Sequence, residues 1–318
     1  MSDGSSDNDH TVFAALKVYA ANEIMKTGLL LVHCTRRRIK RAKRSTNINR
    51  FKDHFGARPH VVAQIWEDLQ LTDIADAKIT GKEVNLEYFL MSLQTLKCYP
   101  KEWEREAMFD ISHSYGREWA FLFIDKLRAL KHEKIIWPED NFGDDLWVIT
   151  VDGTHCWISE PTHPTWSIDT DYYSHKFGKA GVNYELGISL STNALVWMNG
   201  PFPAGESDNK TFKKRGLKAK LESLKKRGIA DGGYPGHPTL LSTPNNHDSK
   251  QVKKFKSRAL KRHETFNGMT KRFDCLNGRF RHSVDRFGSC FEAVCVICQY
   301  ILENGEPLCD IMIKELFD

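Results

Sequence analysis

Hydrophobic and polar positions follow a helical period in the first part of the chain and a different pattern after residue 146. Apolar residues recur at helical spacing over residues 12–33 and 50–135, as in "HVVAQIWEDLQL" and "EYFLMSLQTLKCY". Strand-like alternation is absent between residues 50 and 135, so we predict helices throughout that region. Residues 1–10 are polar and acidic, and we predict that they are disordered.

Two neighbouring helices are predicted in the segment "YPKEWEREAMFDISHSYGREWAFLFIDKLRAL". The first ends at Phe109, "DIS" breaks the pattern, and the second begins at His113 or Ser114. Ser112 or Ser114 would cap the second helix. A DNA-binding helix-turn-helix has this pattern, but so does an ordinary helical hairpin, and both interpretations stay open.

From residue 146 the pattern favours strands. The run "LWVITV" is almost entirely apolar, which is typical of a central strand covered on both faces. The segments "NYELGISL" and "ALVWMNG", separated by "STN", predict an antiparallel hairpin. A helix over Leu217, Leu221 and Leu224 follows, then strands at "RGIA" and "TLLST", and then a long basic helix from Lys250.

The order of these elements predicts the α/β class. Three strands, a helix, a strand and a final helix fit a ribonuclease H-like mixed sheet flanked by helices. In such a sheet the first three strands are antiparallel and the later ones are added parallel. An all-α N-terminal region with a candidate helix-turn-helix precedes the sheet. We therefore expect an acidic tail, helix and basic run over 1–49, a helical region over 50–140, and the sheet domain over 141–318.

The positive charge of the chain is concentrated in one run. The formal net charge is +5 and the sequence pI is about 8.6, which suits an acidic partner such as nucleic acid. Seven of the nine residues from Arg36 to Arg44 are basic. A solvated linker, a nuclear localisation signal and a phosphate-binding arm all explain this run. The candidate DNA contacts in it are Arg36, Arg37, Arg38, Lys40 and Arg41.

Neither secretion nor a membrane span is expected. The N-terminus lacks the basic region of a signal peptide. The apolar stretch from Val12 to Val32 is interrupted by Lys17, Glu23 and Lys26, whereas a transmembrane helix needs about 20 mostly apolar residues. We therefore expect a soluble intracellular protein whose eight cysteines are reduced thiols.

The cysteines near the C-terminus allow a zinc site to be drawn, but the local pattern argues against one. Cys295 and Cys298 form a CxxC motif, with Cys290 and His282 nearby. The run "FEAVCVICQYIL" is apolar and reads as one buried helix, without the turn that a zinc knuckle needs. We expect no zinc.

Three carboxylates fall where the predicted sheet would bring them together. Asp152 ends the first strand, Asp231 ends the fourth, and Glu264 lies in the late basic helix. The first and fourth strands of this sheet are neighbours, so their carboxyl ends would place Asp152 beside Asp231. Taken singly, an aspartate before glycine is usually a turn residue and a glutamate in a basic helix is usually solvated.

The pattern of the late helix supports the grouping. Its apolar stripe comprises Phe266, Met269, Phe273 and Leu276. At about 100° per residue, Glu264 falls on the opposite side, together with Asn267 and Lys271.

A chemical reason exists for such a set of carboxylates. Phosphodiester cleavage and transfer can use two Mg²⁺ ions roughly 3.5–4 Å apart, one activating the attacking oxygen and one stabilising the leaving oxygen. Hard cations of this kind prefer carboxylate oxygens and water over thiols and imidazoles. Asp152, Asp231 and Glu264 are therefore candidate metal ligands, and Lys271 could hold a DNA phosphate beside them.

The motifs around these residues resemble a known family. "VDGTH", "DGGYPG" and "HETFNGMTKRF" resemble the signatures of DDE transposases of the PIF/Harbinger group, a branch of the DDE superfamily endonucleases. "KFGKAGVNYELGISL" and "FPAGESDNKTF" resemble further stretches of the same family. The resemblance covers roughly residues 145–285.

The resemblance implies a ribonuclease H-like DDE catalytic domain that cuts and joins DNA at transposon ends with Mg²⁺ or Mn²⁺, two ions in all. By matching motif it makes Asp152, Asp231 and Glu264 the catalytic residues and metal ligands, and it places Lys271 and its neighbour Arg272 at the DNA. It also implies action in the nucleus rather than the cytoplasm, on transposon ends and target DNA. A Myb-like partner protein often assists this family, and further copies of the chain are expected as partners.

One motif departs from the family pattern. The family commonly has a histidine before the aspartate of "GESDNKTF", where this chain has Ser207 before Asp208. Because Asp208 precedes a predicted helix, we expect it to be a helix N-cap, and we keep it as a secondary metal candidate.

Two other functions remain open at this point. The chain could be a domesticated, transposase-derived nuclear DNA-binding protein that no longer transposes. It could also be a non-catalytic helix-turn-helix regulator whose C-terminal half is only a scaffold.

Overall fold

The computed structural model describes residues 20–138, 146–159, 170–309 and 311. These residues form two compact units, one containing the chain up to Ala129 with Phe273–Cys275, and the other containing the rest. The predicted disorder of residues 1–10 and the first turns of the predicted helix over 12–33 lie outside the described residues.

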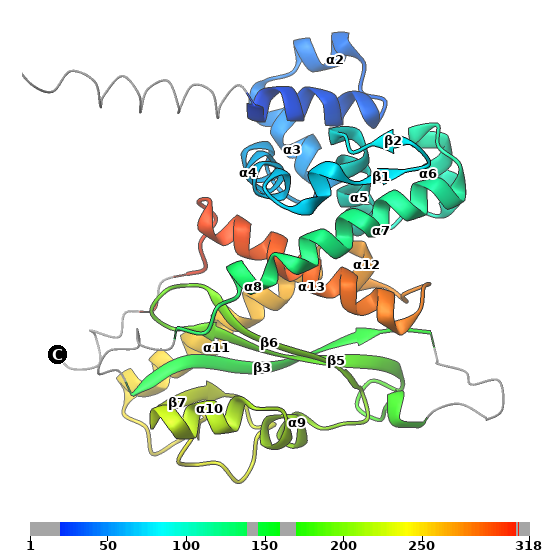
Figure 1. The fold of residues 1–318 in the computed structure, drawn as a ribbon. Coiled ribbons are helices and arrows are strands. Elements are labelled where there is room, and N and C mark those ends of the chain that lie inside the picture. The colour runs from blue at the N-terminus through cyan, green and yellow to red at the C-terminus, as the bar shows by residue number, and fades with distance from the viewer. Residues whose placement is uncertain (1–19, 139–145, 160–169, 310, 312–318) are drawn as a thin grey trace, which may run out of the picture. The chain divides into compact units, whose positions relative to one another are not determined.

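The N-terminal unit is mainly helical, as predicted. Residues 20–31 are helical. The elements that follow are α2 (Arg36–Arg41), α3 (Arg44–Phe55), α4 (Pro59–Gln70), η1 (Asp73–Asp76), β1 (Lys78–Ile79), β2 (Lys82–Glu83), α5 (Leu86–Cys98), α6 (Glu102–Phe109) and α7 (His113–Ala129) (Figure 1).

Aromatic side chains form the centre of this unit. Phe89 of α5 stacks on Trp66 of α4 with ring centroids 5.4 Å apart and contacts Phe123 of α7 at 5.5 Å. Trp119 of α7 is fully buried and stacks on Tyr88. The predicted break between two helices is confirmed, since α6 ends at Phe109 and α7 begins at His113. Whether this pair binds DNA stays a prediction.

The prediction that residues 50–135 lack strands was wrong at one place. β1 and β2 pair antiparallel through Lys78↔Glu83 and Ile79↔Lys82. Thr80 and Gly81, which connect them, both have positive φ angles of 47° and 78°. Consecutive positive φ angles are typical of the tight type I′ turns that join hairpin strands. Strands this short carry no alternation that a sequence pattern could reveal.

The basic run is a short helix rather than an extended linker. Thr35 is the N-cap of α2, and its side-chain oxygen accepts a hydrogen bond from the backbone N–H of Arg38 at 3.2 Å. The five candidate DNA contacts in this helix are all exposed. Their role in DNA binding stays a prediction.

The C-terminal unit contains a mixed sheet. Its elements are α8 (Lys131–Lys134), β3 (Trp147–Trp157), η2 (Thr170–Tyr172), β4 (Tyr173–Ser174), β5 (Lys179–Ser189), β6 (Leu195–Pro203), α9 (Asp208–Lys214), α10 (Leu217–Leu224), β7 (Arg227–Ala230), β8 (Leu241–Ser242), α11 (Lys250–Thr270) and α13 (Val284–Glu303). The short α12 (Asp274–Asn277) follows α11.

The pairing of the strands agrees with the predicted mixed sheet. The order is β4-β5-β3-β7-β8, with β6 paired to β5. β3, β5 and β6 are antiparallel, whereas β7 pairs parallel to β3 and β8 pairs parallel to β7. The first and fourth predicted strands, β3 and β7, are therefore neighbours, as expected.

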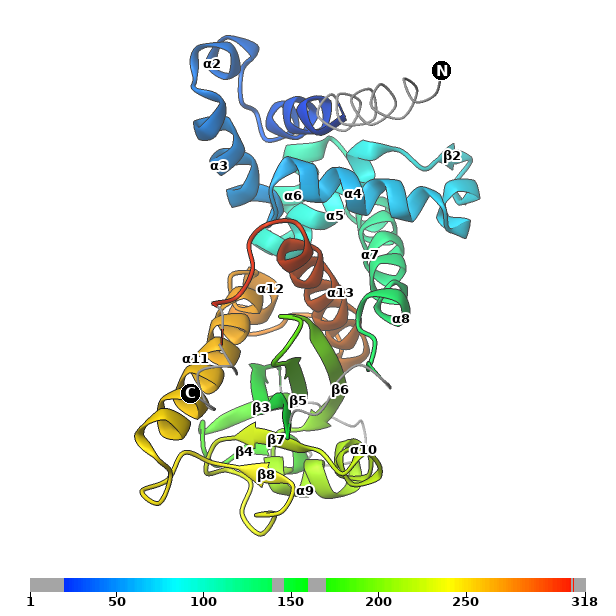
Figure 2. The ribbon, with the colours of Figure 1, turned by 90° about the vertical axis from the view of Figure 1, so that its left-hand side faces the viewer.

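Helices cover both faces of this sheet (Figures 1 and 2). On one face, Phe212 of α9 and Leu217 of α10 join a buried cluster with Ile149 of β3. On the other face, Phe255 and Ala259 of α11 pack with Ile229 of β7. Burial on both sides explains why "LWVITV" is almost entirely apolar.

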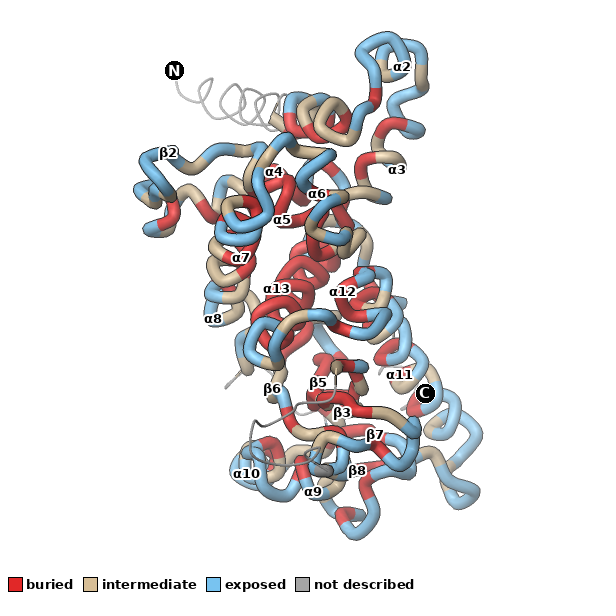
Figure 3. The backbone as a smooth tube through the Cα atoms, turned by 90° about the vertical axis from the view of Figure 1, so that its right-hand side faces the viewer, coloured by how far each residue is buried: buried red, intermediate tan, exposed pale blue. Residues whose placement is uncertain are grey.

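α13 is one continuous helix buried along most of its length (Figure 3). It contains Cys290, Cys295 and Cys298, all of them buried. The prediction of a single buried helix here is confirmed. Among the helices that the structure describes, none is both long and apolar enough to cross a membrane.

Candidate active site

Asp152 lies inside β3 and not at its end, which corrects the prediction from sequence. β3 continues to Trp157 because β5 pairs with it as far as Trp157↔Gly181. The pairing with β7, however, stops at Val151↔Ala230. Asp152 is therefore the first residue of β3 beyond its neighbour β7, and its side chain lies where the two parallel strands separate.

Asp231 directly follows β7 at the same edge. Its Oδ1 accepts a hydrogen bond from the backbone N–H of Gly233 at 2.8 Å, which closes a tight turn over "DGG". The hydroxyl of Thr243 donates to the Asp231 carbonyl oxygen at 3.3 Å. These contacts fix the backbone of Asp231 next to Asp152.

Asp208 joins these two aspartates and is not the helix cap. Ser207 is the N-cap of α9, with its hydroxyl accepting from the backbone N–H of Lys210. The prediction of an Asp208 cap was wrong because the preceding hydroxyl takes that position. The Asp208 carboxylate instead lies directly over the Cα of Gly153, where any β-carbon would overlap it, and close to Gly233.

The three aspartates interact electrostatically. Burial raises the pKa of Asp152 to about 7, with further contributions from the negative charges of Asp231 and Asp208. Burial also raises the pKa of Asp208, although Lys176 opposes the shift. Asp152, Asp208 and Asp231 therefore form one coupled acidic cluster, which we call the aspartate cluster.

The predicted face of α11 lies against β3. Asn267 donates a hydrogen bond from Nδ2 to Asp152 Oδ2 at 3.1 Å. Glu264 lies one turn earlier on that face and is exposed. The side chain of Glu264 makes no hydrogen bond or ion pair with any residue that the structure describes. The structure thus brings Asp152 and Asp231 together and places Glu264 on the adjoining helix, without a contact to either.

Lys271 is engaged inside the protein. Its Nζ lies 2.6 Å from the His155 carbonyl oxygen, 2.9 Å from Cys156 Sγ and 3.4 Å from the Leu276 carbonyl oxygen. These contacts occupy the ammonium donors that a DNA phosphate would need. Lys271 therefore anchors β3 to the end of α11 in this structure, while its neighbour Arg272 is exposed. DNA binding by either residue stays a prediction.

Two further charged residues near the cluster escaped the sequence analysis. Lys176, in the turn between β4 and β5, lowers the pKa of both Asp152 and Asp208. Glu185 is buried in β5, opposite Gly153 in the strand register. Burial raises the pKa of Glu185 to about 7, while a hydrogen bond from Trp197 at 2.9 Å opposes the shift and Asp208 adds to it. A charge within the apolar strand "NYELGISL" was the available signal for Glu185.

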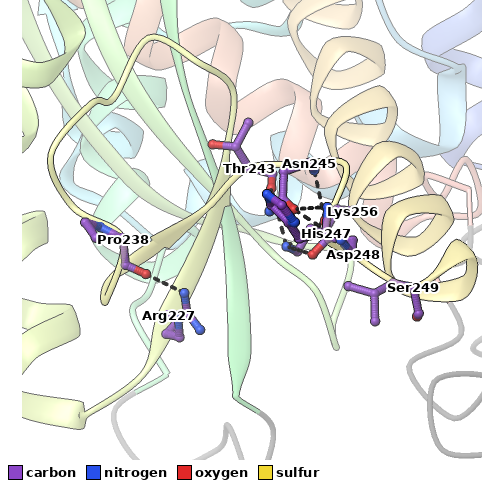
Figure 4. Close-up of polar contacts among 9 residues, drawn as sticks. Arg227, Pro238, Thr243, Asn245, His247, Asp248, Ser249 and Lys256 are labelled. Carbon is purple, nitrogen blue, oxygen red and sulfur yellow. Dashed lines mark hydrogen bonds and ion pairs between the residues drawn. The ribbon is translucent and has the colours of Figure 1, made fainter.

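A polar network supports the β8–α11 loop, which includes Thr243, the residue that contacts Asp231. Figure 4 shows Thr243, Asn245, His247, Asp248 and Lys256 of this network. Lys256 of α11 is almost completely buried, and its Nζ pairs with both carboxylate oxygens of Asp248 at 2.8 and 3.0 Å. The same Nζ reaches the Thr243 carbonyl oxygen at 3.4 Å. Asn245 Oδ1 accepts from the backbone N–H groups of His247 and Asp248. The β8–α11 loop is therefore held in one shape by buried charge.

The donor set of the aspartate cluster suits a hard divalent cation. Carboxylate oxygens are the ligands that Mg²⁺ and Mn²⁺ prefer, and the mutual repulsion shown by the raised pKa of Asp152 favours binding of positive charge. Within the described part of the chain, no three His, Cys, Asp or Glu side chains are already gathered to hold an ion. Mg²⁺ is commonly held by one or two carboxylates together with water and substrate phosphates, so the pair Asp152 and Asp231 suffices.

Comparisons with known proteins agree with this chemistry. Residues 151–299 match a family described as DDE superfamily endonuclease. The match begins one residue before Asp152 and includes Asp208, Asp231 and Glu264. It supports the predicted resemblance to a DDE transposase family, while the Harbinger group stays a prediction. No curated protein matches the sequence.

One solved structure shows a weak likeness. It is entitled "Crystal structure of a pre-cleavage Mos1 transpososome" and shares 9% sequence identity, covering 89% of this chain and 98% of that chain. The TM-score is 0.24, and a value of this size does not establish a shared fold.

Proposed function

We propose that the chain is a metal-dependent DNA endonuclease and transposase that cuts and joins strands at transposon ends. The observation that carries the proposal is the aspartate cluster, in which burial and the negative charge of Asp231 raise the pKa of both Asp152 and Asp208. The match of residues 151–299 to a DDE superfamily endonuclease supports it. The mixed sheet, with β3 between β5 and β7, is consistent with a ribonuclease H-like domain.

Within this function, Asp152 and Asp231 are the residues we assign as ligands of Mg²⁺ or Mn²⁺, two ions in all. When bound, the ions would activate the attacking oxygen and stabilise the leaving oxygen of the phosphodiester. Asn267 orients the Asp152 carboxylate through its hydrogen bond at 3.1 Å. Glu264, exposed one turn away on α11, is the third catalytic carboxylate that the resemblance implies.

Asp208 is the best-placed additional ligand. It is coupled to Asp231 and Asp152, and it is not used as a helix cap. We assign it a metal-binding role beside the pair formed by Asp152 and Asp231.

The finer features of the function follow the resemblance. We propose the PIF/Harbinger group, action in the nucleus, assembly of several copies of the chain, and assistance by a Myb-like partner. The exposed basic side chains of α2 and the α6–α7 pair are the candidate DNA contacts outside the sheet domain.

The direct test is cleavage of a supercoiled plasmid with Mg²⁺, Mn²⁺ or EDTA. We expect nicking with either metal, none in EDTA, and none in the separate variants Asp152→Asn and Asp231→Asn. Asp274→Asn, which changes an exposed aspartate of α12, is the matched control and should keep activity. Cleavage that persists in both cluster variants would overturn the proposal.

The domesticated alternative predicts a different outcome in the same assay. A DNA-binding protein that has lost catalysis would retain affinity for DNA in a gel-shift measurement while nicking no substrate with any metal. If the chain is instead a helix-turn-helix regulator whose sheet domain is only a scaffold, it would also keep its DNA affinity when Asp152 and Asp231 are replaced.

A further inference from the structure

A hollow opens beside the aspartate cluster on the side of the β4–β5 turn. Its volume is about 360 Å³, within the range of small-ligand pockets. Its lining includes Gly153, Asp208 and Gly233, and also His155, Lys176 and Phe177. A ligand in this hollow would therefore be in direct contact with the cluster.

Part of the lining is an aromatic surface. The ring of Phe177 stacks on the ring of His155, with centroids 4.3 Å apart and planes 20° from parallel. Phe177 nevertheless leaves 47% of its surface exposed. An exposed aromatic ring of this kind, supported from behind by a second ring, costs free energy in water unless a ligand covers it.

The imidazole ring of His155 is held in place behind Phe177 and is neutral. Asn183 Nδ2 donates to the Glu206 carbonyl oxygen at 3.3 Å, so Asn183 Oδ1 is the atom that faces His155 Nδ1 at 3.1 Å. His155 Nδ1 must then carry the proton. Burial lowers the pKa of His155, which keeps the ring neutral. Any side chain on Gly181 would overlap the His155 ring, so the glycine permits this position.

Positive charge surrounds the aromatic surface. Lys176 lies next to Phe177 and close enough to the cluster to lower the pKa of Asp152 and Asp208. Lys179 lies 4.3 Å above the ring of Trp157, which is 38% exposed. Lysines interleaved with exposed aromatic rings are the arrangement that binds unpaired nucleotides, because bases stack on the rings and phosphates pair with the lysines.

We propose that this hollow is a subsite for one unpaired nucleotide of the DNA strand that enters the aspartate cluster. The base stacks on Phe177 with His155 behind it, and Lys176 pairs with the phosphate next to that base. Because the hollow touches the cluster, a nucleotide held there fixes the strand relative to the reacting phosphate. This assignment rests on the proposed action on DNA.

The test uses a single strand of about 12 thymidines that carries one 2-aminopurine, within the range of lengths that single-strand sites contact. Binding is followed by 2-aminopurine quenching with the full chain in Ca²⁺, a hard cation that carboxylates also bind. We expect quenching by the unmodified protein. Phe177→Ala should abolish the quenching and weaken affinity about tenfold, a loss of 1.4 kcal/mol that is typical of one stacked base.

Matched variants distinguish loss of base stacking from loss of a phosphate contact and from nonspecific effects of a substitution. Phe177→Tyr keeps the ring and should restore both quenching and affinity. Lys176→Ala should keep the quenching but reduce the salt dependence of binding by about 0.7 in the log–log slope, the value for one phosphate contact on a single strand. Leu71→Ala removes an exposed apolar side chain of the N-terminal unit, outside α2 and the α6–α7 pair, and should change neither readout.

The outcomes distinguish this subsite from the proposed function. Nicking by the protein together with quenching and affinity that do not depend on Phe177 would overturn the subsite and leave the endonuclease standing. Phe177-dependent quenching without nicking would support the subsite and remove the endonuclease. Stronger binding to the matched duplex than to the single strand, unaffected by Phe177→Ala, would also overturn the subsite.

Discussion

The carboxylate of Asp208 rests on the backbone of Gly153, and only the absence of a side chain at residue 153 permits this contact. The contact joins the N-terminus of α9 to the middle of β3, at the residue that follows Asp152. It explains why the aspartate cluster includes a residue that the local pattern assigns to a helix cap.

Gly153→Ala should displace Asp208 and reduce DNA nicking about a hundredfold, since a displacement of about 1 Å in an active site has a cost of that size. Thermal unfolding should show that the sheet persists, because the extended backbone of β3 can accommodate an alanine. Gly232→Ala is the control. It lies beside Asp231, a β-carbon there meets no atom within 4 Å, and its nicking rate should be unchanged.

Ser207 and Asp208 should separate stability from catalysis. Ser207→Ala removes the cap of α9 and should lower the free energy of unfolding by about 1 kcal/mol, with little effect on the nicking rate. Asp208→Asn should reduce the nicking rate about 10–100-fold, which is the loss of activity seen when support for a metal ligand is removed. It should leave the free energy of unfolding unchanged or higher, because it removes repulsion from the cluster. Denaturant unfolding and plasmid nicking measure the two effects. A stability loss in Asp208→Asn equal to that in Ser207→Ala would restore the capping interpretation.

The longer strands of the sheet could be predicted from sequence because each of them carries its own pattern. The apolar run before Asp152 and the two segments around "STN" have apolar faces that must be buried, which identifies them as strands. The order of the elements along the chain then predicts that β3 and β7 are neighbours. The end of β3 could not be found in this way. Asp152 and Gly153 resemble a turn locally, and only pairing with Leu186 and Glu185 of β5 keeps them extended.

The aspartate cluster was predictable only in part for the same reason. Asp152 and Asp231 follow apolar strands, so their positions depend on local sequence and strand order. The position of Asp208 depends on which of two adjacent polar residues caps α9, and Lys176 reaches the cluster through a turn. The contact of the Lys271 ammonium with the backbone of β3 was equally absent from the local pattern. Such outcomes depend on tertiary contacts that no local pattern encodes.

The aspartate cluster should make the stability of the metal-free protein depend on pH. The pKa of Asp152 is about 7 in the folded chain and near 3.8 when unperturbed. The folded state therefore binds the proton more tightly than the unfolded state, and the free energy of unfolding should fall as pH rises from about 4 to about 7. Each pKa unit corresponds to about 1.4 kcal/mol, so the difference is on the order of a few kcal/mol.

Denaturant unfolding in EDTA across this pH range measures the effect, with Asp152→Asn as the reference that lacks the titrating carboxyl. The stability difference between the two proteins should change most between pH 5 and 7, where the unmodified chain loses stability relative to the variant. Added Mn²⁺ should stabilise the unmodified protein more strongly as pH rises, because metal and proton compete for the same oxygens. A difference that does not vary with pH would show that the pKa of Asp152 is not raised in the folded chain.

The buried pair of Lys256 and Asp248 should position Asp231 from a distance. Lys256→Met leaves Asp248 without its charged partner and frees the Thr243 carbonyl, so the β8–α11 loop loses its support. Loss of a hydrogen bond to a charged group costs about 1.5–3 kcal/mol, and we expect a decrease of that size in the free energy of unfolding. Because Thr243 contacts the Asp231 backbone, the nicking rate should fall as well, under conditions where the variant is fully folded.

Lys253→Met is the matched control on α11: its Nζ contacts only the exposed Asn246 among the described residues, so both quantities should stay close to those of the unmodified protein. An unchanged nicking rate in Lys256→Met, despite lower stability, would show that the loop supports the fold but not the position of Asp231.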